Sequence, residues 1–285
     1  MTARAARART VPSEEGPLLS AQPMPTHPPV ADDSPDFITA VARGFAVLRA
    51  FRPQERFVGV REIARRTGLP KSTIGRLCYT LTQLGYLEFV PAEEKYSLGI
   101  GVLSLAQPYL AGLDMREVAR PLMREFAEEE QCTVAMGARD DDHMVFVEIC
   151  HGHQLFRLSL DVGQRVPRGT TALGRAGHVA LPEDERARVL ASYLRGVPSK
   201  EWPKVRDGLR QAVDDYAKYG FCFSIGEWTR EVAAVGVPLV SPRDGKLLAL
   251  SCFGPAQELP RVRLLEELGP RVVQLRDRIK ARLGG

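Results

Sequence analysis

Apolar positions recur at helical spacing through the first part of the chain. They predict a helix over residues 37–51, a second over 58–67 and, after a short turn containing Gly68, a third over 70–84. Pro70 is a suitable first residue for the third helix, because the first turn of a helix does not use the backbone N–H that proline lacks. Gly85 is a suitable residue to end it. Two helices joined by a three-residue turn form a helix-turn-helix.

Two short runs then alternate with a period of two. Residues 86–90 and 95–98 flank the turn PAEE, which predicts a β-hairpin and makes the N-terminal unit a winged helix. Residues 99–113 are amphipathic and predict a linker helix. We therefore expect a winged helix-turn-helix domain over residues 36–98, followed by this linker.

Strand-like and helical runs alternate from residue 114 onward. The predicted strands are 132–138, 144–149, 155–160, 221–224, 232–240 and 246–253. The predicted helices cover 171–181, 183–195, 204–219 and 261–282. Strands at hairpin spacing, with helices before, between and after them, favour an α+β domain over residues 114–285 with one antiparallel sheet flanked by helices.

The composition of residues 1–35 differs from that of the rest of the chain. Residues 1–35 contain seven prolines and few large apolar side chains, so they cannot bury enough surface to offset chain entropy. We predict a disordered tail there. The chain as a whole has 285 residues, 44% of them hydrophobic, which is ample for the cores of two domains.

Positive charge is concentrated in the predicted winged helix. Residues 37–98 carry ten Lys or Arg against five acids, although the net charge of the whole chain is only +4. A cationic excess in one short segment is typical of a nucleic-acid-binding module. The pattern therefore favours DNA as a partner.

The third helix places its polar side chains opposite its leucines. Ser72, Thr73 and Arg76 lie in the first two turns, the end that contacts base edges when such a helix enters the major groove. Arg76 can bind guanine with two hydrogen bonds. The alternative is an ordinary solvated helix face. The predicted DNA-binding residues are Arg43, Arg61, Arg65, Lys71, Ser72, Thr73, Arg76 and Tyr79. We expect the first three to contact the DNA backbone.

The run REIARRTGLPKSTIGRLCYTLTQLGYLE, with KYSLG after it, resembles the IclR-type transcriptional regulators, and the likeness continues over nearly everything after residue 36. The resemblance implies a winged helix paired with a GAF-like effector-binding domain. It also implies a homodimer formed through the N-terminal module, often a dimer of dimers, and an inverted-repeat operator. The stretch DFITAVARGFAVLRAF looks most like the branch that governs catabolism of aromatic acids in the protocatechuate, p-hydroxybenzoate and β-ketoadipate pathways.

The predicted wing departs from this pattern. Its turn carries Glu93 and Glu94, where a wing that contacts phosphates would favour Lys or Arg. Carboxylates are repelled by the DNA backbone, so only Lys95 could make such a contact.

A second candidate site lies at the start of the helix predicted after residue 170. Thr170 or Thr171 can cap this helix, which leaves the amides of Ala172 and Leu173 facing an anion at the positive end of the helix dipole. A small carboxylate effector would fit there. The resemblance implies the same site, because effector pockets in this family are lined by this loop and by the two late strands. The expected effector-binding residues are Thr171, Ala172, Leu173, Ser224, Val232, Ala234, Ser251 and Phe253.

Two alternatives concern this second site. Phe253 can stack on an aromatic acid, or it can shrink the pocket. All eight residues can also be ordinary core and capping residues.

Other constellations carry no chemistry. The five cysteines are scattered without a C-x-x-C pair, which predicts free thiols in a reducing, cytoplasmic setting. Cys150, His151 and His153 match no zinc template, and no nucleophile elbow accompanies any histidine. No run reaches the length of roughly 18 apolar residues that a membrane span needs. We expect no catalytic residue, no metal and no cofactor.

The favoured function is a ligand-responsive DNA-binding regulator of transcription, and not an enzyme. Two alternatives remain: a small-molecule enzyme whose N-terminal module only dimerises, and a DNA-binding protein without an effector. An activator and a repressor of this kind would have the same sequence features, so the sequence leaves both open.

Overall fold

A computed structural model describes residues 34–53, 55–140, 143–152, 160–196 and 198–284. The predicted tail, apart from residues 34 and 35, and the predicted strand 155–160, apart from Leu160, lie outside these residues. The described chain forms two compact units, residues 34–119 and 120–284.

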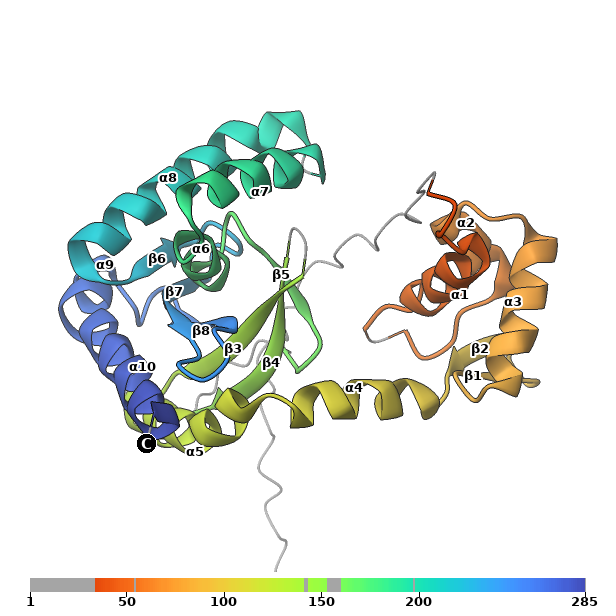
Figure 1. Cartoon of the computed structure of the whole chain (residues 1–285), viewed down its shortest axis with the longest axis horizontal. Helices are drawn as coiled ribbons and strands as arrows, with labels where there is room; N and C mark the ends of the chain where they lie inside the picture. The colour runs from red at the N-terminus through yellow and green to blue at the C-terminus, as the bar shows by residue number, and fades with distance from the viewer. Residues whose placement is uncertain (1–33, 54, 141–142, 153–159, 197, 285) are drawn as a thin grey trace, which may run out of the picture. The chain divides into compact units, whose positions relative to one another are not determined.

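The first unit holds three helices and a hairpin, drawn in red to orange in Figure 1: α1 (Thr39–Arg49), α2 (Val60–Thr67), α3 (Lys71–Gln83), β1 (Leu87–Val90) and β2 (Lys95–Leu98). The two strands pair antiparallel, with Leu87 opposite Leu98. The core gathers around Val47, Ile63 and Ile74, one side chain from each helix, all fully buried. The winged helix-turn-helix fold is confirmed.

Two glycines end the helices of the predicted helix-turn-helix. Gly68 follows α2 with φ of 70° and Gly85 follows α3 with φ of 76°, left-handed values that favour glycine. After the hairpin, α4 (Gly101–Ala111) has no buried residue, and α5 (Asp114–Glu130) runs across the division between the two units.

The second unit is built on a six-stranded sheet in the order β5-β4-β3-β8-β7-β6, with every neighbouring pair antiparallel. The strands, green to blue in Figure 1, are β3 (Thr133–Asp140), β4 (His143–His151), β5 (Arg165–Pro167), β6 (Cys222–Ile225), β7 (Val232–Val240) and β8 (Leu247–Pro255). The predicted α+β class with one antiparallel sheet is confirmed. The short β5 was not predicted, because three residues are too few to show alternation.

The helices of this unit are α6 (Ala172–Val179), α7 (Glu183–Gly196), α8 (Trp202–Tyr219), α9 (Arg261–Arg263) and α10 (Gly269–Gly284), with short 3₁₀ and π turns at Ser199–Glu201 and Leu264–Leu268. All eight residues of α6 are buried, since the helix lies between α8 and strands β7 and β8 (Figure 1). Gly236 allows this close approach, because a Cβ there would lie 2.4 Å from the carbonyl oxygen of Ala172.

The cysteine prediction is wrong for one pair. Cys132 and Cys252 form a disulfide between the start of β3 and β8, strands that are neighbours in the sheet. Sequence separation hid this pairing, because 120 residues lie between the two. Cys78, Cys150 and Cys222 are free and buried, as predicted.

No helix among the described residues is both long enough and apolar enough to span a membrane.

Candidate functional sites

The two faces of α3 differ as the pattern predicts. Ile74, Cys78 and Leu81 are buried, whereas Arg76 and Tyr79 are exposed, the tyrosine by 66%. The N-terminal turn of α3 presents the remaining polar candidates: Lys71 and Ser72 are exposed and Thr73 is half-buried. This face therefore presents cations, hydroxyls and a phenol together.

Gly75 lies on the same outer face. A Cβ at this position would meet no atom within 4 Å, so packing within the chain does not require a glycine. Glycine inside a helix costs about 1 kcal/mol relative to alanine. No packing contact among the described residues offsets this cost.

The three arginines predicted to contact the DNA backbone differ in their surroundings. Arg43 and Arg61 are exposed. Arg65 binds the carboxylate of Glu62 through both Nε and Nη2, at 2.8 and 2.5 Å. Together with Arg66, this bond lowers the pKa of Glu62 to about 2. Arg65 therefore already carries a counter-charge, and it would have to share its guanidinium with a phosphate.

Arg66 is the cation that sequence reasoning missed in this unit. Its guanidinium is buried, and it donates to Glu55, to Glu62 and to the carbonyl of Ala50. It ties the end of α1 to α2, a structural role that an Arg-Arg pair in sequence does not reveal.

The hairpin turn is acidic at its exposed tip. Glu93 and Glu94 are exposed, and Glu94 has φ of 51°, so the turn is tight. Lys95 Nζ lies 3.7 Å from a Glu93 carboxylate oxygen. The only wing cation is thus next to a negative partner, which weakens its attraction to phosphate.

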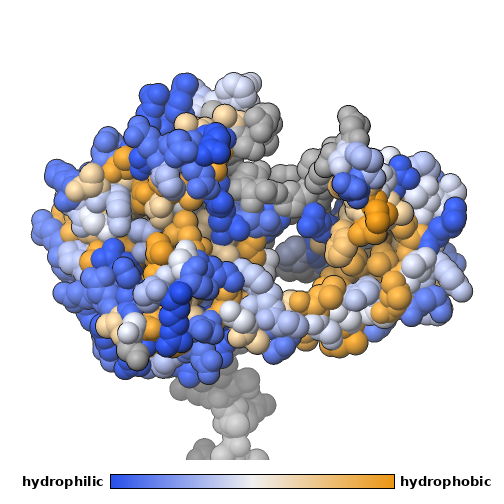
Figure 2. All heavy atoms as spheres, viewed as in Figure 1, coloured by the Kyte–Doolittle hydropathy of each residue, from blue (hydrophilic) through white to orange (hydrophobic). Residues whose placement is uncertain are grey.

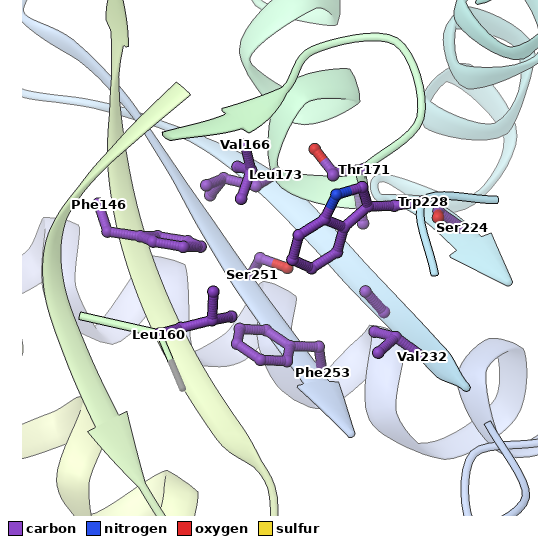
Figure 3. Close-up of a pocket in the computed structure, with 12 residues that line it drawn as sticks. Phe146, Leu160, Val166, Thr171, Leu173, Ser224, Trp228, Val232, Ser251 and Phe253 are labelled. Atoms are coloured by element: carbon purple, nitrogen blue, oxygen red, sulfur yellow. The ribbon is translucent and has the colours of Figure 1, made fainter. Parts of the chain in front are cut away.

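The second unit contains a pocket at the start of α6, shown in Figure 3. All eight residues predicted to bind an effector line it, contributed by the α6 start and by β6, β7 and β8. Four further side chains, which sequence reasoning missed, complete the wall: Phe146, Leu160, Val166 and Trp228. Phe146 and Val166 lie in strands, where alternation could have indicated them, whereas Trp228 lies in a loop without periodicity.

Hydroxyl groups in the pocket wall are already engaged as donors. Ser224 Oγ donates to the carbonyl of Thr170 at 2.9 Å, and Ser251 Oγ donates to the carbonyl of Val235 at 2.9 Å. Because each hydroxyl has one proton, both serines face a ligand mainly as acceptors.

Thr171 is the N-cap of α6. Its Oγ1 donates to the carbonyl of Pro167 and accepts from the amide of Gly174, at 2.6 and 3.0 Å. One of the two threonines that the sequence offered as caps is thereby confirmed. The amides of Ala172 and Leu173 precede the first amide bonded within the helix, so they lie at the positive end of its dipole. They are the donors in the wall best suited to an anion.

Buried charge lies directly behind this helix start. Arg175 is 3% exposed and binds Glu227 with two hydrogen bonds, while it also donates to the carbonyls of Gly169 and Phe223. Gly208 on α8 makes room for this side chain, since a Cβ there would lie 2.3 Å from Arg175 Nη2. The pair fastens the β6–β7 loop to α6.

Comparison with known proteins identifies both units. Residues 40–91 match the IclR helix-turn-helix domain, and residues 107–280 match the bacterial transcriptional regulator IclR C-terminal domain. A solved IclR family transcriptional regulator from Brucella abortus is 40% identical with a TM-score of 0.78, over 91% of this chain and 97% of that one.

Two further relatives extend the comparison. The chain is 30% identical to the HTH-type transcriptional regulator TsaQ1/TsaQ2 of Comamonas testosteroni, over 86% of this chain and 88% of that protein. An IclR homologue from Microbacterium hydrocarbonoxydans, solved in complex with 4-hydroxybenzoate, shares the fold at 22% identity and a TM-score of 0.68, over 86% of this chain and 99% of that one.

These relatives are regulators of transcription rather than enzymes. The chain belongs to the IclR family of DNA-binding bacterial transcriptional regulators.

Proposed function

We propose that a small carboxylic acid binds in the pocket at the start of α6 and changes the affinity of the protein for an operator. The observation that carries this proposal is the pairing of free helix-start amides with an otherwise apolar wall. Such a pocket binds one anionic group through the amides of Ala172 and Leu173 and buries the rest of the molecule.

The acid has an aromatic body in this proposal. Phe146 and Phe253 supply flat apolar surface for a ring, and Ser251 offers an acceptor for a hydroxyl substituent. Two relatives support this class by name: the homologue complexed with 4-hydroxybenzoate, and the Pca regulon regulatory protein of Pseudomonas putida, which is 25% identical over 76% of this chain and 74% of that protein. The regulated genes would then serve the breakdown of such acids.

The exposed face of α3 contacts the operator in this proposal. Arg76, Ser72 and Thr73 lie towards the end of the helix that contacts base edges, with Lys71 and Tyr79 beside them. Arg43, Arg61 and Arg65 contact phosphates. The acidic hairpin tip stays away from the backbone, because Glu93 and Glu94 repel it.

A second copy of the chain covers the apolar surface of the first unit. Ile38, Val41 and Phe45 are exposed along α1, and Leu103 and Tyr109 are exposed along α4. Figure 2 shows hydrophobic atoms gathered over these two helices. Exposed apolar patches of this kind mark protein interfaces. A homodimer would place two α3 helices on an inverted-repeat operator, since two-fold symmetry in the protein mirrors symmetry in the site.

The test uses the full-length protein and an operator selected from random duplexes. Fluorescence anisotropy measures its affinity for that operator with and without benzoate, 4-hydroxybenzoate, protocatechuate, glucose or propylamine. We expect an aromatic acid to change the affinity about 5- to 150-fold, the usual range of coupling between two sites. If none of the five compounds changes it while binding stays specific, the result favours the effector-independent alternative. A change with glucose or propylamine alone would reject a carboxylate effector.

A further inference from the structure

Trp228 differs from most other residues of the pocket wall in how it is held. Nine of the other lining residues lie on strands or in α6, and Thr171 caps that helix. Trp228 lies in the loop of residues 226–231 between β6 and β7. It is half-buried and packs against the hydrophobic cluster that the pocket shares. Figure 3 shows its indole reaching across the middle of the lining side chains, between Thr171 on one side and Ser251 and Phe253 on the other.

The pocket leaves little free space beside the indole. The free volume of the pocket is about 30 Å³, which is room for one or two water molecules. An apolar cavity that admits benzene in another protein measures about 150 Å³. An aromatic acid therefore does not fit beside Trp228 in this arrangement, and a side chain must move before it binds.

The loop is held by polar contacts at its start and at Glu227, and these are the contacts that a movement of Trp228 would have to break or carry with it. Gly226 has φ of 64° and donates to the carbonyl of Val232, so the chain turns sharply just before the tryptophan. Glu227 is anchored at both its groups: its carboxylate accepts from Arg175, and its carbonyl accepts from Lys204 Nζ at 2.9 Å. The glutamate side chain is 28% exposed, so water reaches this anchor.

We propose that Trp228 is a plug for the effector pocket: its indole occupies the position of the effector ring, and it swings out with residues 226–231 when the effector binds. The Glu227–Arg175 pair is the catch that holds the plug in place. Trp228 thereby determines specificity, because only a ligand that binds the α6 amides and the apolar wall well enough to displace an indole is admitted. This inference rests on the proposed function.

The experiment compares benzoate and free indole as probes of the full-length protein by titration calorimetry. Trp228→Ala removes the plug, and Trp228→Phe retains a smaller one. Trp202→Ala is the matched control. Trp202 is the other of the two tryptophans, lies at the start of α8 and does not line the pocket. Glu227→Gln weakens the catch and leaves the indole in place.

We expect Trp228→Ala to bind benzoate about tenfold more tightly than the wild type, because apparent affinity scales with the fraction of molecules whose pocket is open. Glu227→Gln should shift affinity in the same direction by a smaller factor, and Trp228→Phe should lie between wild type and Trp228→Ala. Free indole should bind Trp228→Ala, whose cavity has the shape of indole, and should bind neither wild type nor Trp202→Ala.

The results separate this inference from the proposed function. Indole binding by Trp228→Ala, with no benzoate binding by any variant, would reject the carboxylate effector and keep the plug. Weaker benzoate binding by Trp228→Ala would show that the indole is a fixed wall for the ligand, and would overturn the plug. Failure of Trp228→Ala to bind either probe would overturn it as well. Circular dichroism of each variant confirms that the comparison is made between folded proteins.

Discussion

Arg76 is the residue of α3 whose chemistry best fits base recognition. Its side chain is exposed in the second turn of the helix and has no carboxylate partner among the described residues, whereas Arg65 binds Glu62. A planar guanidinium can form two hydrogen bonds to one guanine. We therefore propose that Arg76 contacts a base and that Arg65 contacts the DNA backbone.

Arg76→Ala should weaken binding to the selected operator by about 10- to 100-fold, since a bidentate base contact contributes about 1–3 kcal/mol of discrimination. Binding to unrelated duplexes should change little. Anisotropy titrations with the two kinds of DNA measure both affinities. Gln83→Ala is the control, because Gln83 is exposed at the far end of the same helix. An equal loss on both kinds of DNA would show that Arg76 contacts only phosphate.

His178 links the stability of the second unit to pH. It is buried in α6, and burial, followed by the charges of Arg168 and Arg186, lowers its pKa from 6.5 to about 4. Between these values the unfolded chain binds a proton that the folded chain does not. The free energy of unfolding therefore falls as pH falls through this window, by about 2 kcal/mol between pH 7 and pH 5.

His178→Gln removes this titration and should flatten the dependence of unfolding free energy on pH by that amount. Urea unfolding at pH 7, 6 and 5 measures it. Parallel curves for wild type and His178→Gln would mean that His178 is protonated in the folded protein as readily as in the unfolded chain.

At the scale of elements, periodicity predicted most of what the structure shows. The helices α2 and α3 and the strands β7 and β8 have long, regular patterns, and each lies where the pattern placed it. The six-residue loop carrying Trp228 has no period, so its place over the pocket follows only from the antiparallel pairing of β6 with β7. The Cys132–Cys252 pair likewise depends on β3 lying next to β8.

In the pocket, too, features set by neighbouring residues were predictable from the sequence, whereas contacts between distant residues were not. The capping threonine and the two free amides follow from a local pattern of residues 170–174, and Thr171 does cap α6. The ion pair of Arg175 and Glu227 joins residues 52 apart in sequence. No spacing rule connects them, because the contact exists only once α6 lies against the sheet.

At the scale of the whole molecule, the proposed function requires that the two sites influence each other's binding. Linkage makes this influence reciprocal: if an acid changes operator affinity by some factor, saturating operator must change acid affinity by the same factor. The prediction holds whether the acid favours or opposes DNA binding, because only the sign of the coupling differs. It also needs no knowledge of how the two units are arranged.

We therefore expect calorimetric titration of the active acid, with and without saturating operator, to give two dissociation constants whose ratio equals the ratio of operator affinities measured with and without the acid. A typical coupling of 1–3 kcal/mol corresponds to about 5- to 150-fold in each ratio. Arg76→Ala should lose the operator effect on acid binding at DNA concentrations where it no longer binds, while its acid affinity without DNA stays that of the wild type. Unequal ratios would show that the acid acts outside the two-site equilibrium, for example by binding the DNA or by changing the association of protein copies.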